Sequence, residues 1–214
     1  MAEKAFLPEL IRNVAFLSHG GVGKTTLVEA LLFGAGLIKR MGSIEDGNTV
    51  SDYRQIEIER KSSVGLSVTH FVQDDVKINV IDTPGYADFI GDVYCALRVV
   101  EGAVLLVSAQ SGIEVGTQQS WSYLDKKPTI LFINRMDREN ANFEKALSSI
   151  RDFFGSDAVP LILPIGQGQN FKGFINLSKL YNDAVSFLKQ REFTLYEKKH
   201  KDKPDLLYKE VNIK

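Results

Sequence analysis

A glycine-rich run over residues 18–26 is the feature that most constrains what this chain can fold into. The run reads Ser18-His19-Gly20-Gly21-Val22-Gly23-Lys24-Thr25-Thr26, and it lies between an apolar segment, 14–17, and a segment, 25–37, with helical spacing of apolar residues. Its spacing is that of a phosphate-binding loop, except that Ser18 replaces the first glycine. Glycines let the N–H groups of 21–25 converge on a phosphate at the positive end of a helix. The run therefore predicts a strand, a phosphate loop and a helix.

Three side chains of this run have predicted roles. We expect Lys24 to bridge the β- and γ-phosphates of a nucleotide and Thr25 to offer its hydroxyl to Mg²⁺. His19 lies within the loop, and we expect it to pack against neighbouring residues and not to catalyse.

Two further motifs follow predicted strands later in the chain. Asp82-Thr83-Pro84-Gly85 ends one strand, where Asp82 is placed to hold Mg²⁺ through water and the Gly85 amide to sense the γ-phosphate. Asn134-Arg135-Met136-Asp137 ends another, where the Asp137 carboxylate can accept both guanine donors, N1–H and N2–H₂. Open α/β sheets bind ligands at the carboxyl ends of their strands. The three motifs in this order therefore predict a guanine-nucleotide site.

Predicted strands and helices alternate over the first 154 residues, which indicates a doubly wound α/β fold. The strands are expected at 14–17, 64–72, 76–81, 103–109 and 129–134, and the helices at 25–37, 89–99, 117–125 and 143–154. We expect three layers, α/β/α, around a mostly parallel central sheet in which 64–72 and 76–81 are adjacent. Residues 38–63 read as a long loop with one helical turn near Ile56 and Ile58, and such loops are usually functional or mobile.

Short predicted strands replace this alternation in the last part of the chain. They are expected at 159–165, 171–177, 184–188 and 193–196. We therefore expect a nucleotide-binding domain over 1–157, incomplete at its C-terminal end, and the start of a small α+β subdomain over 158–214.

Composition excludes several classes of protein. The chain has 26 Lys+Arg against 27 Asp+Glu and is 44% apolar, which is typical of globular proteins and not of disordered or fibrous ones. The one cysteine, Cys95, excludes an intramolecular disulfide, favours the cytoplasm and is expected in the core. The N-terminal segment lacks a signal-peptide core, and no uncharged run is long enough for a membrane span. We expect a monomer without membrane association or direct DNA binding.

The motifs resemble the N-terminal part of translation elongation factor G, particularly the divergent bacterial elongation factor G-like branch. The resemblance runs from about residue 11 to 188. It includes 82–89, similar to the family's switch II; 134–143, similar to its guanine motif and the turn after it; and 160–177, similar to the start of its insert subdomain. The resemblance implies a P-loop GTPase fold with an insert subdomain. It also implies a Mg²⁺-dependent GTPase that binds GTP and GDP and acts with the ribosome.

The same resemblance assigns residues 39–63 as switch I, which orders around Mg²⁺ and the γ-phosphate. Glu59-Arg60-Lys61-Ser62-Ser63-Val64 stands where the family has Glu-Arg-Gly-Ile-Thr-Ile, so Ser63 takes the place of the threonine that ligates Mg²⁺. The implied metal site is thus Thr25, Ser63 and, through water, Asp82. The implied catalytic residues are Lys24, Gly85 and Tyr86.

The sequence departs from the family in ways that bear on function. Tyr86 stands where a histidine usually orients the attacking water, and a phenol cannot supply imidazole chemistry at neutral pH. We therefore expect slow hydrolysis that relies on positioning and charge. Gly21 replaces an aspartate that would help to hold a monovalent cation, and Arg135 replaces a lysine that covers the guanine face. No serine-alanine guanine motif appears before Lys214, so we expect a fragment that stops inside the insert and cannot translocate alone.

Three alternatives stay open at this point. The chain could be a guanine-nucleotide switch with little hydrolysis, because of Tyr86. It could be an ATPase, if Asp137 is incidental. It could also belong to a ribosomal-protection protein of the same superfamily, whose distinguishing domains lie outside this chain.

Overall fold

The computed structural model of the chain describes residues 5–155, 158–179 and 182. These residues form two compact units. The first holds the described residues up to Ala158 together with Gln167–Phe171, and the second holds Val159–Gly166 and the described residues from Lys172 on. The nucleotide motifs all lie in the first unit.

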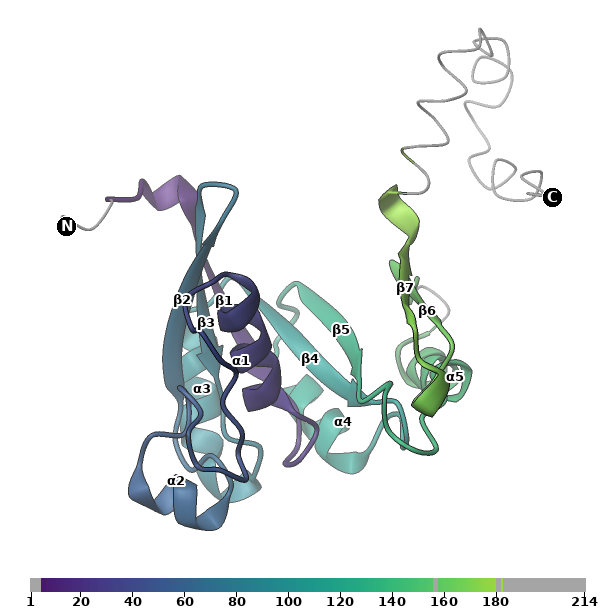
Figure 1. Cartoon of the computed structure of the whole chain (residues 1–214), viewed down its shortest axis with the longest axis horizontal. Coiled ribbons are helices and arrows are strands. Elements are labelled where there is room, and N and C mark those ends of the chain that lie inside the picture. The colour runs from purple at the N-terminus through teal and green to yellow at the C-terminus, as the bar shows by residue number, and fades with distance from the viewer. Residues whose placement is uncertain (1–4, 156–157, 180–181, 183–214) are drawn as a thin grey trace, which may run out of the picture. The chain divides into compact units, whose positions relative to one another are not determined.

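A five-stranded sheet forms the centre of the first unit (Figure 1). Its strands are β1 (Ile11–Leu17), β2 (Ser67–Gln73), β3 (Val76–Asp82), β4 (Gly102–Ser108) and β5 (Thr129–Asn134), in the spatial order β2-β3-β1-β4-β5. Strand β2 pairs antiparallel with β3, and the other neighbours are parallel. The helices are α1 (Lys24–Gly34), α2 (Gln55–Arg60), α3 (Ile90–Arg98), α4 (Val115–Ser122) and α5 (Phe143–Phe154). The predicted α/β fold with a mostly parallel sheet is confirmed.

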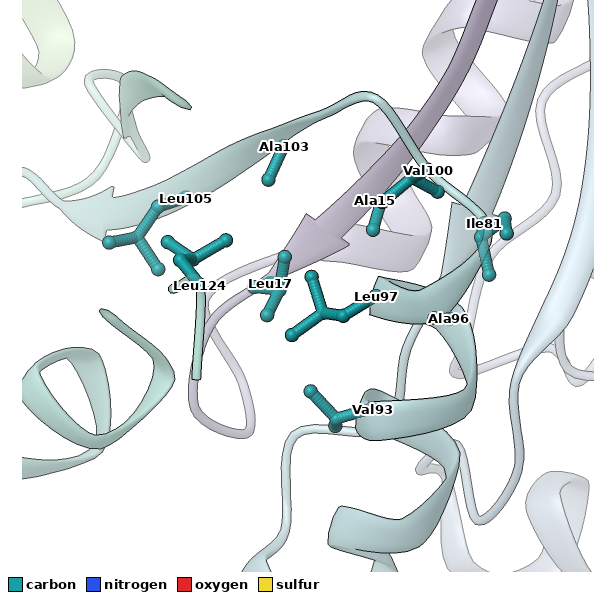
Figure 2. Close-up of a cluster of buried hydrophobic side chains, with 10 residues drawn as sticks. All are labelled: Ala15, Leu17, Ile81, Val93, Ala96, Leu97, Val100, Ala103, Leu105 and Leu124. Carbon is teal, nitrogen blue, oxygen red and sulfur yellow. The ribbon is translucent and has the colours of Figure 1, made fainter. Parts of the chain in front are cut away.

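The alternation of side chains along β1 divides the core into two clusters. Ala15 and Leu17 point to the face covered by α3, where they join Leu97 of that helix and Leu105 of β4 (Figure 2). Phe16 points to the opposite face, which is covered by α1. Helices on both faces of the sheet give the three-layer α/β/α arrangement.

The structure refines several predicted boundaries. Helix α1 ends at Gly34, before the predicted residue 37, because Gly36 adopts a left-handed φ of 72° and the Leu37 N–H turns back to the Leu32 carbonyl. Strand β2 starts at Ser67 and not at residue 64. The expected helical turn in the long loop is the six-residue helix α2.

Cys95 corrects one prediction. Its thiol is exposed on α3, whereas Val93, Ala96 and Leu97 of that helix are buried. The apolar neighbours in the sequence suggested burial, but the helical period turns residue 95 away from the sheet.

The second unit contains a β-hairpin. Strand β6 (Ile162–Ile165) pairs antiparallel with β7 (Gly173–Asn176). The strands expected at 184–188 and 193–196 lie outside the described residues. Within the described part of the chain, no helix is long and apolar enough to cross a membrane.

Candidate functional site

The phosphate loop joins the end of β1 to the start of α1, as its glycines require. Gly21 and Gly23 have left-handed φ angles of 80° and 99°, and α1 begins at Lys24 directly after them. Val22 is buried between the two glycines, while Thr26 is exposed in the first turn of the helix. The loop therefore surrounds the N-terminus of α1, where backbone N–H groups have no partner within the helix.

Lys24 lies buried at the centre of this loop. Its Nζ donates to the Ser18 carbonyl at 3.0 Å and to the His19 carbonyl at 3.1 Å. Burial lowers the pKa of Lys24 to about 8, although the nearby carboxylates of Asp82 and Asp52 act in the opposite direction. The ammonium group is thus held at the loop by carbonyl oxygens, which anionic phosphate oxygens could replace.

Thr25, Ser63 and Asp82 come together beside Lys24 although they belong to three separate segments. The Thr25 hydroxyl donates to Asp82 Oδ2 at 2.8 Å and lies 3.3 Å from the Ser63 hydroxyl. Asp82 is only 2% exposed, and burial raises its pKa to about 6, while Lys24 and the Thr25 hydroxyl act to lower it. The three residues predicted for the metal site therefore form one cluster, in which Thr25 and Asp82 are buried and Ser63 is half-buried.

The segment after β3 lies against the phosphate loop. A side chain at Gly85 would meet the Gly20 nitrogen at 2.6 Å and Lys24 Nζ at 2.7 Å, so the backbone approaches this closely only because residue 85 is a glycine. The Tyr86 ring lies over Gly20, within 3.1 Å of where a Cβ would stand, and is 54% exposed. Gly85 and Tyr86, which together with Lys24 are the predicted catalytic residues, therefore both lie next to the phosphate loop.

The predicted base-reading motif, 134–137, contacts the phosphate loop through Asn134. Asn134 Nδ2 donates to the Val22 carbonyl at 2.8 Å and occupies the space beside Gly23. Arg135 follows in a left-handed conformation with φ of 64°. The Asp137 side chain is 73% exposed, and its Oδ2 lies 3.9 Å from Arg138 Nε.

His19 connects the loop to α4. Its Nδ1 lies 3.4 Å from the Thr117 hydroxyl and its Nε2 lies 3.3 Å from a Glu114 carboxylate oxygen. Burial lowers its pKa, while Glu114 acts to raise it. A side chain at Gly116 would overlap the Cβ of His19. These contacts agree with a packing role for His19.

Comparison with known proteins identifies the family. The family description "Elongation factor Tu GTP binding domain" matches residues 9–205. The chain belongs to this family. It is 39% identical to an elongation factor G-like protein of Mycobacterium tuberculosis over 163 residues, which are 75% of this chain and 23% of that protein. It is 38% identical to elongation factor G 2 of Treponema pallidum over 188 residues, which are 86% of this chain and 28% of that protein.

A solved structure supports the same assignment. A crystal structure of a protein from Thermus thermophilus matches with a TM-score of 0.73 and 32% sequence identity, covering 78% of this chain and 25% of that one. The resemblance to elongation factor G is confirmed. The chain spans about a quarter of the length of the relatives that it matches.

Sequence reasoning missed Asp52, which the fold of this GTP-binding domain brings into the buried cluster. Asp52 is 5% exposed, and burial raises its pKa while a hydrogen bond from Ser63 lowers it. Among the residues that the structure describes, its Oδ2 has no hydrogen-bond partner, and neither has Asp82 Oδ1. In the sequence, Asp52 is one of several polar residues in a long loop. Nothing in the sequence distinguishes it from the other polar residues there.

The unpartnered oxygens allow a test of whether the cluster fits Mg²⁺. Two buried carboxylates with free oxygens and two hydroxyls form an all-oxygen donor set, which Mg²⁺ prefers. No group of three or more His, Cys, Asp or Glu residues within the described ranges could hold a metal by itself. The cluster therefore fits a small divalent cation that completes its coordination with water and phosphate oxygens.

Glu29 is a second residue that sequence reasoning missed. It is buried in α1, and its carboxylate accepts the Gly42 N–H at 2.8 Å and the Val50 N–H at 2.5 Å. Charge-assisted bonds of this kind are stronger than neutral ones. Glu29 therefore fixes the middle of the long loop to the helix that follows the phosphate loop.

Proposed function

We propose that this chain is the GTP-binding and GTP-hydrolysing module of an elongation factor G-like translation factor that acts with the ribosome in the cytoplasm. The observation that carries the proposal is the polar cluster of Thr25, Ser63 and Asp82 next to buried Lys24. These residues are remote in sequence, and the pairing of β1 with β3 brings Asp82 beside the phosphate loop, but the three polar side chains also turn toward one another. A nucleoside triphosphate with Mg²⁺ explains why they do.

In this proposal each part of the site has a defined task. The loop N–H groups and Lys24 bind the phosphates, and the Gly85 amide contacts the γ-phosphate. Thr25 and Ser63 would hold Mg²⁺ through their hydroxyl groups, and Asp82 and Asp52 would hold it through water. Bound Mg²⁺ would neutralise the charge that develops on the phosphate oxygens. Asp137 selects guanine, and Arg135 covers the face of the base.

A second candidate function is a guanine-nucleotide switch with little hydrolysis. It is favoured by Tyr86, because the family usually has at this position a histidine that orients the attacking water. The Tyr86 ring lies on Gly20 of the phosphate loop. In this case the bound nucleotide would change the order of the loops 39–63 and 82–89 without efficient turnover.

Single-turnover release of phosphate from GTP in the presence of Mg²⁺ tests the proposal. We expect slow release by the parent chain and none above background for Thr25→Ala, because that variant loses a metal ligand. Thr26→Ala is the matched control, since Thr26 is the exposed neighbour. GTP binding without phosphate release by the parent chain would favour the second candidate. Phosphate release by Thr25→Ala as fast as by an active parent chain would contradict the place of Thr25 in the metal site.

A further inference from the structure

Glu57 is a buried carboxylate that has no role in the site described above. It lies in α2, is 2% exposed and is among the largest fully buried side chains. A buried carboxylate is costly unless hydrogen bonds satisfy it. Its contacts therefore show what it holds in place.

Among the described residues, the Glu57 carboxylate accepts hydrogen bonds from backbone N–H groups at both ends of α2. Oε2 accepts the Arg54 N–H at 3.2 Å, which closes the start of α2. Oε1 accepts the N–H of Val64 at 3.1 Å and that of Gly65 at 3.2 Å. One oxygen atom thus binds the two residues that directly follow Ser63.

The backbone of Glu57 holds the other side of Ser63. The Ser62 N–H donates to the Glu57 carbonyl at 3.1 Å. Both sequence neighbours of Ser63 are therefore bonded to one residue, and the Ser63 hydroxyl lies 3.3 Å from that of Thr25. Arg54 closes over this arrangement, with its guanidinium 3.7 Å from Oε1 and in the space that a side chain at Gly65 would need.

We infer that Glu57 is a positioning residue that holds the Ser63 hydroxyl in the metal site. This inference rests on the proposed function, because it assigns Glu57 a role toward the cation that the cluster fits. It also makes a claim that does not depend on nucleotide: Glu57 keeps the backbone of residues 62–65 ordered in the nucleotide-free chain. The two parts are tested separately.

Hydrogen exchange in the nucleotide-free chain tests the order of the segment. In Glu57→Ala we expect the amides of Val64 and Gly65 to exchange at least about tenfold faster, since their acceptor is lost. Glu57→Gln keeps one acceptor oxygen and should show a smaller increase. Glu59→Ala, at an exposed glutamate of the same helix, is the matched control and should match the parent chain. Unchanged amides of β1 and β4 show that each variant is folded, and unchanged Val64 and Gly65 amides in Glu57→Ala would overturn the inference.

Release of a fluorescent, non-hydrolysable GTP analogue tests the role toward the metal. Its dissociation rate is measured with Mg²⁺ and with excess chelator. The rate in chelator divided by the rate in Mg²⁺ gives the factor by which the metal slows release. We expect Glu57→Ala to lower this ratio about tenfold, with little change in the rate in chelator. Glu57→Gln should keep most of the ratio, and Glu59→Ala all of it.

Ser63→Ala separates positioning from a general loss of structure. We expect it to lower the ratio as much as Glu57→Ala does, and the double variant to lose no more than either single one, because both changes remove the same ligand. A lower ratio in Ser63→Ala with the parent ratio in Glu57→Ala would overturn the inference and leave the proposed function standing. Failure of the parent chain to bind the analogue would overturn the proposed function and the metal-site role of Glu57 together.

Discussion

Lys24 and Asp82 are buried charged groups whose pKa values are shifted in opposite directions by the same cause. Burial lowers the pKa of Lys24 to about 8 and raises that of Asp82 to about 6. Each shift means that burial disfavours the charged form, even though the two groups attract each other. The free site therefore holds charge at a cost to stability that phosphate and a cation would offset.

A pH dependence of stability follows from Asp82. Its carboxyl group binds its proton more tightly in the folded chain than in the unfolded one, so the folded state carries more protons between roughly pH 4 and 6. The free energy of unfolding should therefore fall as the pH rises through this window, by about 2 kcal/mol from this group. Urea unfolding without nucleotide or Mg²⁺ should show that Asp82→Asn removes this part of the slope. Identical slopes for the variant and the parent chain would contradict the buried environment of Asp82.

Tyr86 gives a prediction about rate. Tyr86→His should raise GTP hydrolysis, both intrinsic and on ribosomes, by at least about tenfold, because an imidazole can orient and accept a proton from water at neutral pH. Tyr86→Phe is the control, since it keeps the ring on Gly20 and removes only the hydroxyl. A Tyr86→His variant no faster than the parent chain would show that the tyrosine does not limit turnover.

The site residues differ in how far the sequence could predict them. The phosphate loop is predicted by its own nine residues, because its geometry depends on local glycines. Asp52, Glu29 and Glu57 are not, because their roles depend on which segments the fold brings beside them. Carboxylates in a long polar loop or on a helix look like solvated residues until their partners are known.

At the scale of elements, the end of α2 carries a local strain. Lys61 follows the helix with a left-handed φ of 51°, a conformation that favours glycine. The family pattern that the sequence resembles has glycine at this position. Lys61 also pairs with Glu45, but that contact is exposed and contributes little to stability.

We therefore expect Lys61→Gly to raise the free energy of unfolding by about 0.5 to 1 kcal/mol, since the relief of left-handed strain exceeds the added entropy of the unfolded chain. Lys61→Asn should give a smaller increase, because asparagine tolerates this conformation better than lysine. Urea denaturation of the three proteins measures the order. A loss of stability in Lys61→Gly would mean that the ion pair with Glu45 outweighs the strain.

The elements themselves were largely predictable, because apolar period and glycine position mark them. Strand β4 was predicted as a continuous apolar run, and it lies second from the β5 edge with both faces covered. The exposure of Cys95 was not predicted, since the turn of α3 relative to the sheet is set by tertiary packing. The start of β2 at Ser67 likewise depends on tertiary partners, because Glu57 accepts the N–H groups of Val64 and Gly65 and Asp92 accepts that of Leu66.

At the scale of the whole molecule, the order of the motifs along the chain is what made the fold predictable. Each motif follows a strand, and parallel pairing of β1 with β3 and β4 places two of them at one edge of the sheet. The Asn134 side chain then connects the third motif to the phosphate loop. The Asp137 carboxylate remains exposed after the end of β5.

Calorimetric titration of the chain with GDP, GTP and ATP in the presence of Mg²⁺ tests the central claim most directly. We expect binding of both guanine nucleotides and none of ATP at the same concentrations. Asp137→Asn should make the free energy of guanine-nucleotide binding less favourable by about 1 to 3 kcal/mol, because a carboxylate that accepts two hydrogen bonds is lost. Equal affinity for ATP and GTP, or no binding of either, would contradict a guanine-nucleotide site in this chain.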